Sequence, residues 1–341
     1  MKKYLLPEKG NFYKANLHCH TTVSDGAKTP EEIKTIYKQM GYSIVAYTDH
    51  NVLISQSHLS DDTFLALNGV EVDVNEKETD KKYLIKTCHI CFIAKEPDNI
   101  TQPIWHRSLY LNGGNSQNYR EPVKFDENEP DFVRTYTKEC ICDMMKIPAD
   151  KGFFVTYNHP TWSCEDYNDY INYDGMHAFE MFNGGCLAAG YEDYNPRVYD
   201  DMLRSGKKIY CIGADDNHNR GNENSRRFDS GWAYTVIKAD KLEYRTITKA
   251  LENGDFYASE GPEIYELWYE DEKVHIKCSD ADRINCNYGI RKAQTVLSEN
   301  GVPVTEAVFD VPSDCMYFRI TVIDEKGRQA CTNAYYPEDL N

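Results

Sequence analysis

Long apolar runs are absent from this sequence. No stretch reaches the ~20 consecutive apolar residues that a helix needs to cross a bilayer, so we expect no membrane partner. The chain opens with MKKYLLPEKGNFYK, in which Pro7, Glu8 and Lys9 interrupt what would be the apolar part of a secretory leader. We therefore expect a cytoplasmic protein.

Basic residues are few relative to acidic ones. The chain has 38 Lys and Arg against 55 Asp and Glu, which gives a formal net charge of -17. Because long nucleic acids bind to basic surfaces, we expect no long nucleic acid as a partner. We expect most of the Asp and Glu side chains to lie on a solvated surface. Carboxylates that bind cations are neutralised locally, so a metal site could hold some of the remaining acidic residues.

Internal repeats and low-complexity tracts are also absent. The 341 residues, 41% of them hydrophobic, are enough for a barrel-sized domain and a smaller one. The 12 cysteines are scattered, and several, such as Cys88, Cys91 and Cys211, lie in apolar runs that predict buried free thiols. Free thiols agree with a reducing compartment.

The first 50 residues predict a strand, a helix and a second strand. Residues 11–20 alternate as in a strand, and Thr29-Pro30-Glu31-Glu32 is a capping box with proline at the first helical position. Apolar residues then recur at helical spacing as far as Gly41, and residues 43–47 predict a short buried strand. This order is the unit of a parallel α/β fold.

The α/β pattern continues to about residue 261, interrupted by an insertion at about 95–130 that is rich in Asn, Gly, Pro and Tyr. We predict further strands at 64–67, 70–74, 84–94, 153–157, 177–182, 208–213 and 232–237, and helices at 131–145, 191–205 and 241–253. After that the chain shows short alternating strands at 265–269, 273–278 and 317–323. The predicted domains are therefore 1–261, which is α/β, and 262–341, a small β-sandwich-like domain.

Histidines and acids gather at the ends of the predicted strands or inside them. The histidines are His18, His20, His50, His89, His159 and His218, and the acids are Asp25, Glu71 and Asp216. In a parallel barrel the carboxyl ends of the strands meet on one face, so residues far apart in sequence come together there. His18 and His20 are two apart, so on a strand both imidazoles point the same way.

Each of these signals is weak by itself. Asp25 alone would be a turn residue, and His89 lies in an apolar run where a hydrogen-bonded core histidine is the alternative. Glu71 lies inside an apolar strand, where a metal is a natural partner for a buried carboxylate and a solvent-facing edge position is the alternative. Their joint placement at successive strand ends favours a metal site.

Five short motifs follow one another between residues 16 and 218. They are NLHCHTTVSDG (16–26), YTDHN (47–51), GVEV (69–72), YNHP (157–160) and GADDNH (213–218). With a histidine in an intervening strand, they resemble the PHP (polymerase and histidinol phosphatase) family of metal-dependent phosphoesterases. Gly231-Trp232 and GDFYASEGP (254–262) make the CehA/McbA-like branch the most similar. The resemblance implies a distorted (β/α)7 barrel followed by the small β domain.

The resemblance also implies a ligand set for two or three divalent cations. His18, His20, Glu71 and Asp216 would hold the first, Glu71 would bridge to a second held by His89 and His159, and Asp25, His50 and His218 would hold a third. Asp25 stands where some relatives have histidine, and Asp216 is chosen over Asp215 because it keeps the family's D-x-H spacing. Mixed imidazole and carboxylate ligands suit Mn, Fe or Zn.

The expected activity is hydrolysis of a small phosphomonoester or nucleotide. A metal-bound water, activated to hydroxide, would attack with Glu71 and Asp216 in catalytic roles, while Asp49 and Asn158 would orient ligand imidazoles. Arg220, Arg226 and Arg227 are the candidate substrate-binding residues, although a solvated loop arginine is as common. The 95–130 insertion would be either a lid over the site or surface decoration.

Two other functions remain open, and a third is disfavoured. The same cations suit a carboxylic or carbamic ester hydrolase, and the cage would also suit a non-catalytic metal-containing binding module. A proofreading-like domain of a polymerase is disfavoured by the acidic charge and the lack of a polymerase body. The sequence does not determine the oligomeric partner or the role of the C-terminal β domain.

Overall fold

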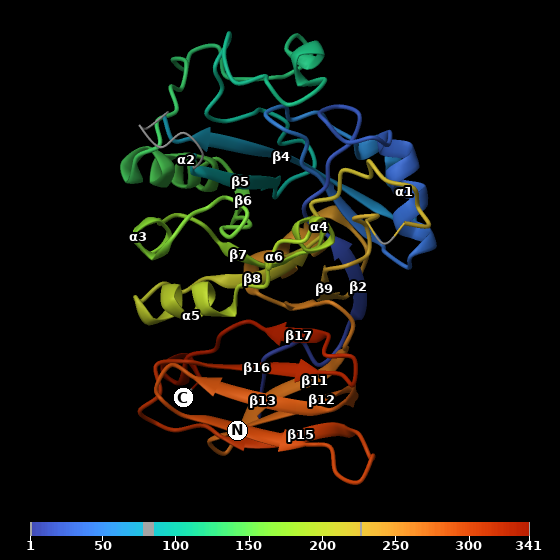
Figure 1. Cartoon of the computed structure of the whole chain (residues 1–341), viewed down its shortest axis with the longest axis vertical. Coiled ribbons are helices and arrows are strands. Elements are labelled where there is room, and N and C mark those ends of the chain that lie inside the picture. Colours follow the sequence, from blue (N-terminus) through green and yellow to red (C-terminus); the bar gives the residue numbers. More distant parts are fainter. Residues whose placement is uncertain (1, 78–84, 226, 341) are drawn as a thin grey trace.

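The computed structural model describes residues 2–77, 85–225 and 227–340. These residues form a mixed α/β structure with one 13-stranded sheet, which extends through most of the molecule, and a 4-stranded sheet at one end (Figure 1). The strand order in the large sheet is β14-β13-β16-β17-β10-β9-β2-β3-β4-β5-β6-β7-β8. Its second half, from β2 to β8, carries the chemistry described below.

The strands of that half are β2 (Asn11–Asn16), β3 (Ile44–Tyr47), β4 (Leu65–Asn75), β5 (Thr87–Ala94), β6 (Phe153–Tyr157), β7 (Ala178–Asn183) and β8 (Tyr210–Ala214). β2, β3 and β4 run parallel, as do β6, β7 and β8. β3, β6 and β7 are buried along their whole length, which is why their sequences are almost continuously apolar.

β5 runs against both of its neighbours, β4 and β6, so the expected parallel series is wrong at this strand. Antiparallel pairing sets Asp73 of β4 opposite His89 and Glu71 opposite Cys91. The beginning of β5, rather than its end, therefore lies beside the carboxyl end of β4. This reversal brings His89, the third residue of β5, to the edge of the sheet where the parallel strands end.

Helices connect these strands. They are α1 (Pro30–Gln39), α2 (Lys138–Asp150), α3 (Tyr167–Tyr170), α4 (Gly184–Ala189), α5 (Pro196–Arg204) and α6 (Tyr244–Asn253), with 3-10 turns η1 (Ser57–Leu59), η2 (Ser116–Tyr119) and η3 (Pro337–Asp339). The predicted capping box is confirmed, because Glu32 N donates to Thr29 Oγ1 and Thr29 N donates to Glu32 Oε2. In the part of the chain that the structure describes, no helix has the length and apolar character needed to span a bilayer.

Three predicted helices begin later than the sequence indicates, and the one predicted at 241–253 does so by three residues, at Tyr244. The helix predicted at 131–145 begins at Lys138, where the Thr137 side chain caps it, and the preceding residues run extended past the insertion. The helix predicted at 191–205 begins at Pro196, since proline fits the first helical turn and disfavours helix before it.

Two predicted strands are a single strand. Residues 64–67 and 70–74 both belong to β4, because Gly69 continues the ladder between them. Residue 84, the predicted start of the next strand, lies outside the described residues, and β5 begins at Thr87. The later strands of the series agree with the prediction to within about two residues at each end.

β9 (Tyr234–Ala239) and β10 (Phe256–Ser259) join the two halves of the large sheet. β9 pairs with β2 and β10, and β10 pairs with β17 (Gln329–Thr332). β8, at the far end of the strand series, also approaches β9. Thr235 Oγ1 donates to Gly213 O at 2.9 Å and accepts from Gly213 N at 3.2 Å, although the described residues form no backbone ladder there.

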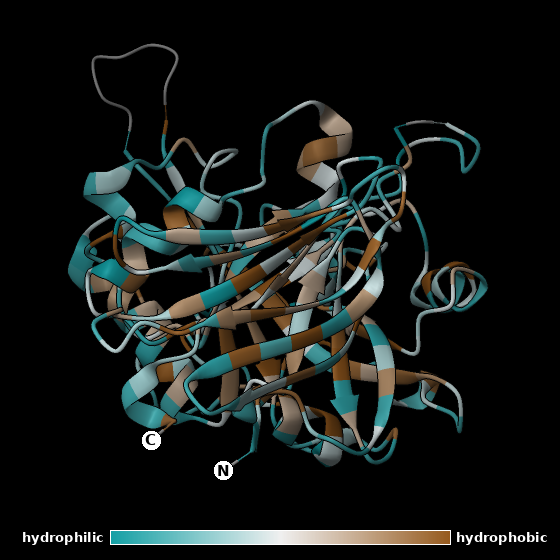
Figure 2. Cartoon of the chain, turned by 90° about the horizontal axis from the view of Figure 1, so that it is seen from below, coloured by the Kyte–Doolittle hydropathy of each residue, from teal (hydrophilic) through white to brown (hydrophobic). Residues whose placement is uncertain are grey.

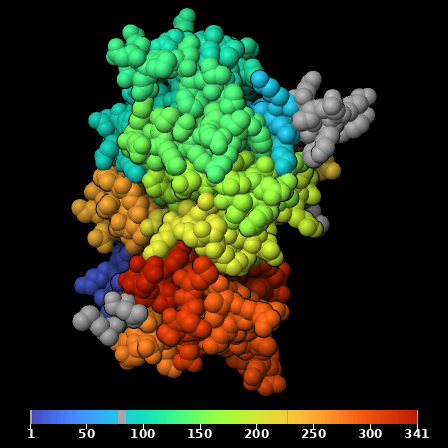
Figure 3. All heavy atoms as spheres, turned by 90° about the vertical axis from the view of Figure 1, so that its left-hand side faces the viewer, coloured from blue at the N-terminus to red at the C-terminus, as the bar shows by residue number. Residues whose placement is uncertain are grey.

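The C-terminal residues form a two-layer β module at one end of an elongated molecule (Figure 3). Its other strands are β1 (Lys3–Tyr4), β11 (Ile264–Glu270), β12 (Lys273–Ala281), β13 (Arg283–Tyr288), β14 (Ala293–Leu297), β15 (Val304–Asp310) and β16 (Phe318–Ile323). One layer is β1-β11-β12-β15, and β14-β13-β16-β17 packs against it through a shared apolar core. Hydropathy alternates along these strands, as the banding in Figure 2 shows.

The first residues of the chain also belong to this module. Lys3 and Tyr4 pair with Tyr269 and Trp268 of β11, and Leu6 is buried in the same core. The chain then passes directly into β2, the first strand of the site-bearing half.

Candidate metal centre

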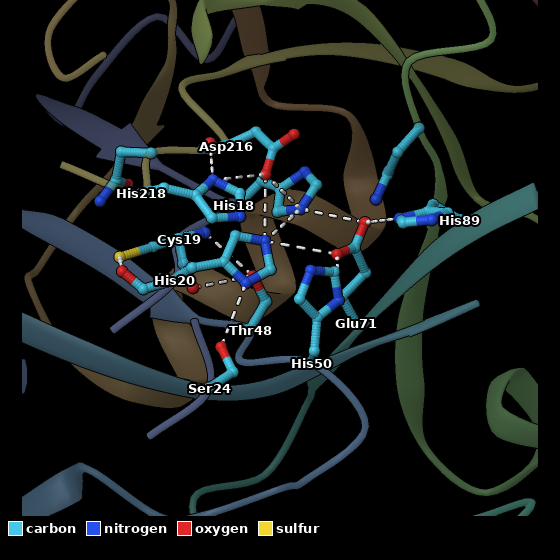
Figure 4. Close-up of polar contacts among 12 residues, drawn as sticks. His18, Cys19, His20, Ser24, Thr48, His50, Glu71, His89, Asp216 and His218 are labelled. Carbon is cyan, nitrogen blue, oxygen red and sulfur yellow. Dashed lines mark hydrogen bonds and ion pairs between the residues drawn. The ribbon is translucent and has the colours of Figure 1, made fainter. Parts of the chain in front are cut away.

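The two histidines of the first motif follow β2, at the edge of the sheet (Figure 4). β2 ends at Asn16, and the next residues pair with the chain that leaves β8. Asp216 N donates to His18 O at 2.9 Å, and His20 N donates to Asn217 O at 3.1 Å. The two imidazoles point the same way, as predicted, with their Nε2 atoms 3.2 Å apart.

Glu71 lies at the centre of the cluster and is fully buried in the middle of β4 (Figure 4). Its carboxylate faces ring nitrogens of five histidines. Oε1 is 3.2 Å from His18, 3.0 Å from His89 and 3.3 Å from His159, and Oε2 is 3.3 Å from His20 and 3.0 Å from His50. A single carboxylate therefore touches ligand candidates from four segments of the chain.

Asp216 closes another side of the cluster. Its Oδ1 is 3.2 Å from His18 Nε2 and 3.0 Å from His20 Nε2, and its Oδ2 is 3.7 Å from His159 Nε2. Asp216 has φ +49° and His159 has φ +27°, values that residues with a Cβ rarely adopt. Backbone strain of this kind gathers at functional sites, and here both strained residues direct their side chains into the cluster.

Asp25 and His218 form a second group beside the first. Asp25 Oδ1 is 3.3 Å from His218 Nε2, 3.7 Å from His50 Nε2 and 3.9 Å from His20 Nδ1. His20 and His50 thus lie between the two groups, each with one ring nitrogen toward Glu71 and the other toward Asp25. The structure brings all nine predicted ligands into one continuous cluster.

Glu180 of β7, which the sequence analysis did not single out, orients two of these residues. His18 Nδ1 lies 2.9 Å from Glu180 Oε1, and His159 N donates to Glu180 Oε2 at 3.1 Å. Asn183 Nδ2 donates to both Glu180 Oε2 and Asp216 Oδ2. The sequence signal was an acid inside the apolar run AFEMFN, the same kind of signal that marks Glu71.

Asp49 and Asn158, the predicted ring-orienting residues, bond elsewhere. Asp49 accepts hydrogen bonds from the backbone and hydroxyl groups of Thr21 and Ser24, and Asn158 donates to Cys91 Sγ. Among the described residues they have no hydrogen bond to an imidazole, and Glu180 takes that role.

Asp215 lies behind the cluster. Its carboxylate accepts hydrogen bonds from Tyr37 Oη and from the backbone N–H groups of residues 231–233. Burial raises the pKa of Asp215 to about 6, against these hydrogen bonds, which lower it. This second acid of the motif therefore braces the turn into β9, and Asp216 faces the histidines as the D-x-H spacing predicts.

Charge in the cluster is balanced by close opposite charges. Burial opposes ionisation of Glu71, yet His18, His89 and His50 hold its pKa well below the ordinary range. Burial likewise disfavours a charged His159, but the carboxylates of Glu71 and Asp216 raise its pKa to about 9. The site stabilises anionic carboxylates through nearby positive charge, which is what a divalent cation supplies.

The geometry around Glu71 Oε2 indicates that cations fit. This atom is buried, and although His20 Nε2 and His50 Nδ1 lie near it, no hydrogen bond of acceptable geometry reaches it in the described chain. A cation among these atoms would use that lone pair. The candidate ligand groups, whose atoms lie within 4.8 Å of one another, are His20-Asp25-His50-His218, His18-His159-Asp216, His18-Glu71-Cys91 and His50-Glu71-His89.

The 95–130 insertion packs directly on this cluster. A Cβ on Gly113 would lie 2.7 Å from His50 Cβ, and Ser116 Oγ donates to His50 O at 2.7 Å. Asn115 N donates to Ser24 O, next to Asp25. Only glycine allows so close an approach at position 113, so the insertion is a wall of the site and not surface decoration.

A cavity of about 380 Å³ opens over the cluster. Trp162 stands edge-on to the rings of His89 and His159, with centroids 5.2 and 5.1 Å away. Of the predicted substrate-binding arginines, Arg220 and Arg227 line the cavity, Arg220 is paired with Asp25 at 2.6 Å, and Arg226 lies outside the described residues.

The chain matches no family model and no curated protein. Among solved structures it is similar to a two-domain protein from Bacteroides vulgatus that contains a predicted PHP-like metal-dependent phosphoesterase. That match has 14% sequence identity and a TM-score of 0.44, and covers 97% of this chain and 98% of that one.

Two further solved structures are similar over the larger part of the chain. One, from Bifidobacterium adolescentis, is classed as a metal-dependent phosphoesterase (14% identity, TM-score 0.39, 64% of this chain and 91% of that one). The other is an amidohydrolase from Chromobacterium violaceum with bound sulfate and no metal (17% identity, TM-score 0.37, 61% of this chain and 88% of that one).

Proposed function

We propose that this protein is a metal-dependent phosphoesterase of PHP type that hydrolyses a small phosphomonoester or nucleotide. The observation that carries the proposal is the buried carboxylate of Glu71, within 3.0–3.3 Å of five imidazoles at the floor of an open cavity. A set of this kind, placed where a ligand can enter, is characteristic of a hydrolytic metal centre.

The residues that would hold the cations are those predicted. As the resemblance implies, His18, His20, Glu71 and Asp216 would hold one cation, Glu71 together with His89 and His159 would hold a second, and Asp25, His50 and His218 would hold a third. Divalent Mn, Fe or Zn bound there would polarise a substrate oxygen and lower the pKa of a water. Glu180 and Asn183 hold the rings and carboxylates at their angles.

The reaction adds one water across a P–O bond. The water oxygen forms a bond to phosphorus, the bond to the leaving alcohol oxygen breaks, one proton ends on that oxygen and the other stays with the phosphate. Asp216 faces the reacting position, with Asn183 Nδ2 donating to its Oδ2, so it is suited to orient the attacking water.

Arginine in the cavity favours phosphate over a neutral ester. Arg227 and Arg220 both line the cavity, and although Arg220 is paired with Asp25, arginine suits the charge of a phosphoryl group. The cavity is also lined by Trp162, Cys186 and Ala189, and these apolar side chains support the second candidate, a carboxylic or carbamic ester hydrolase.

The proposal extends to the architecture. We assign the α/β part of residues 1–261, apart from β1 and the residues next to it, to a distorted (β/α)7 barrel of the CehA/McbA-like branch, with the β module of 262–341, which β1 joins, as an accessory domain. The hydrogen bonds between Thr235 and Gly213, which bring the last strand of the series to β9, support a barrel that is almost closed.

Metal analysis coupled to a substrate screen tests the proposed activity. The purified protein is assayed for bound Mn, Fe and Zn, then offered phosphomonoesters, nucleotides, and aryl acetates and carbamates with added Mn²⁺. Phosphate release that a chelator abolishes is the expected result. Cleavage of the neutral esters alone would replace the first candidate by the second, and no bound metal with no cleavage would overturn both.

A further inference from the structure

Arg134 is a buried arginine that the metal centre does not use. It lies in the extended segment between the insertion and α2, and 8% of its surface is exposed. With Tyr110, His50 and His89 it lines a second cavity of about 640 Å³. That cavity and the one over the metal ligands share Asp25, His50, His89 and Arg220, so the two adjoin, and together they are called the cleft below.

One edge of the Arg134 guanidinium is fully engaged. Nη1 donates to Asn51 Oδ1 at 2.5 Å and to Asp73 O at 2.9 Å, and the ring of Tyr110 lies 4.4 Å from Cζ. Tyr110 Oη also accepts a hydrogen bond from Arg134 N at 2.8 Å. These contacts fix the plane of the guanidinium, so its orientation does not depend on a ligand.

The other edge has no acceptor. Nε is buried without a hydrogen-bond partner, and no hydrogen bond from Nη2 is found among the described residues. Nε–H and Nη2–H are the parallel pair that binds a carboxylate or phosphate side-on. A buried donor without an acceptor costs free energy, and this cost is recovered when a ligand supplies the acceptor.

The positive charge of Arg134 is also only partly compensated. Among the described residues its ion-pair partner is Asp73, with Oδ1 3.8 Å from Nη1, and the Asp73 carboxylate already accepts from Asn51 Nδ2 and Asn75 Nδ2. The wall of the cleft therefore contains a rigid, buried guanidinium, with 2% of its side chain exposed, whose bidentate edge has no acceptor among the described residues.

We infer that the substrate carries a carboxylate as a second anionic group, which the Nε and Nη2 atoms of Arg134 bind while the scissile group lies at the metal ligands. This inference rests on the proposed function. A carboxylate is favoured over a second phosphate because Asp25 and Asp73 line the same cleft, and a dianion would meet more repulsion from them than a monoanion.

The test compares phenyl phosphate with 3- and 4-carboxyphenyl phosphate. We expect the wild-type protein to show a kcat/KM about 10- to 100-fold higher for at least one carboxylated substrate. In Arg134→Met this preference should fall to near unity, and in Arg134→Lys it should be intermediate, because lysine keeps the charge and loses the fork. Arg107→Met is the matched control, since Arg107 lies in the neighbouring insertion but pairs with Asp131 and does not line the cleft.

Three results would overturn the inference while leaving the phosphoesterase activity intact. They are equal kcat/KM for phenyl and carboxyphenyl phosphates, a preference that survives in Arg134→Met, and a preference for 1,4-phenylene bisphosphate over both carboxylated substrates. If Arg134 only braces the insertion, Arg134→Met and Asp73→Asn will lower activity on all substrates by the same factor and leave their ratios unchanged.

Calorimetry separates this inference from the proposed function. If no phosphate ester is cleaved, the phosphoesterase proposal fails, and binding of terephthalate and benzoate to the metal-loaded protein still tests Arg134. Tighter binding of terephthalate by about 10-fold, lost in Arg134→Met, supports the carboxylate site. Equal binding of the two acids by the wild-type protein overturns it.

Discussion

The two ends of the molecule bury different kinds of side chain. In the C-terminal module, β12 and β13 bury every second residue, and the residues they bury are apolar. At the other end of the large sheet, His18, His20 and Glu71 are as inaccessible as any core residue. The module is arranged for stability, whereas the site buries charge that costs stability unless the charges and a ligand compensate one another.

Among the substitutions that test this difference between the two ends, Glu71→Gln should have the largest effect on activity and on bound metal. An amide keeps the shape but loses the negative charge that five imidazoles face, so we expect kcat/KM to fall about 10²- to 10³-fold and bound metal to drop. Steady-state kinetics and metal analysis measure both, with circular dichroism to follow the fold. Glu165→Gln is the control, since Glu165 is a buried glutamate bonded to Tyr136, Tyr157 and Tyr173. Full activity and full metal content in Glu71→Gln would refute the bridging role.

Glu180→Gln should have the next largest effect. A glutamine nitrogen in place of one carboxylate oxygen would face the donors His159 N and Asn183 Nδ2, so the ligands lose their orientation. We expect metal affinity to fall about 10- to 100-fold, which a competitive chelator titration measures. Unchanged affinity would show that the rings are held by their packing alone.

Glu165 should make stability depend on pH independently of the metal centre. Burial raises its pKa from 4.5 to about 7, although the tyrosine hydroxyls lower it. Between these values the folded state binds more protons than the unfolded state, so the free energy of unfolding falls as pH rises, by at most about 1.4 kcal/mol per pH unit from this group.

Denaturant unfolding from pH 4 to pH 8 measures this dependence. In Glu165→Gln the fall should be smaller than in the wild-type protein, and identical slopes for the two proteins would contradict the assignment.

The smallest expected effect is that of Ile320→Val in the core of the module. Ile320 is buried in β16, far along the large sheet from Glu71, so loss of one methylene should cost about 0.5–1.5 kcal/mol of unfolding free energy. The kcat/KM of the folded protein should not change. A loss of activity at full folding would show that the module is coupled to the site.

Much of the fold could be predicted from local patterns. Thr29 and Glu32 cap α1 through contacts three residues apart, and β6 was located from its apolar run. The start of α2 was missed because it depends on the path of the chain after the insertion, which the local sequence pattern does not determine. The direction of β5 was missed because an apolar run is the same in either direction, and pairing with β4 and β6 decides it.

The candidate site likewise has features that the sequence predicts and features that it does not. The sequence by itself determined which residues are available as ligands, because His18 and His20 are two apart and point the same way even though β2 ends at Asn16, and Asp216 and His218 keep a fixed spacing. Only the tertiary structure decided that His20 and His50 lie between two groups, that Glu180 orients the rings, and that Arg134 faces the cleft. Those features depend on contacts between segments tens of residues apart, which the spacing of residues along one chain does not encode.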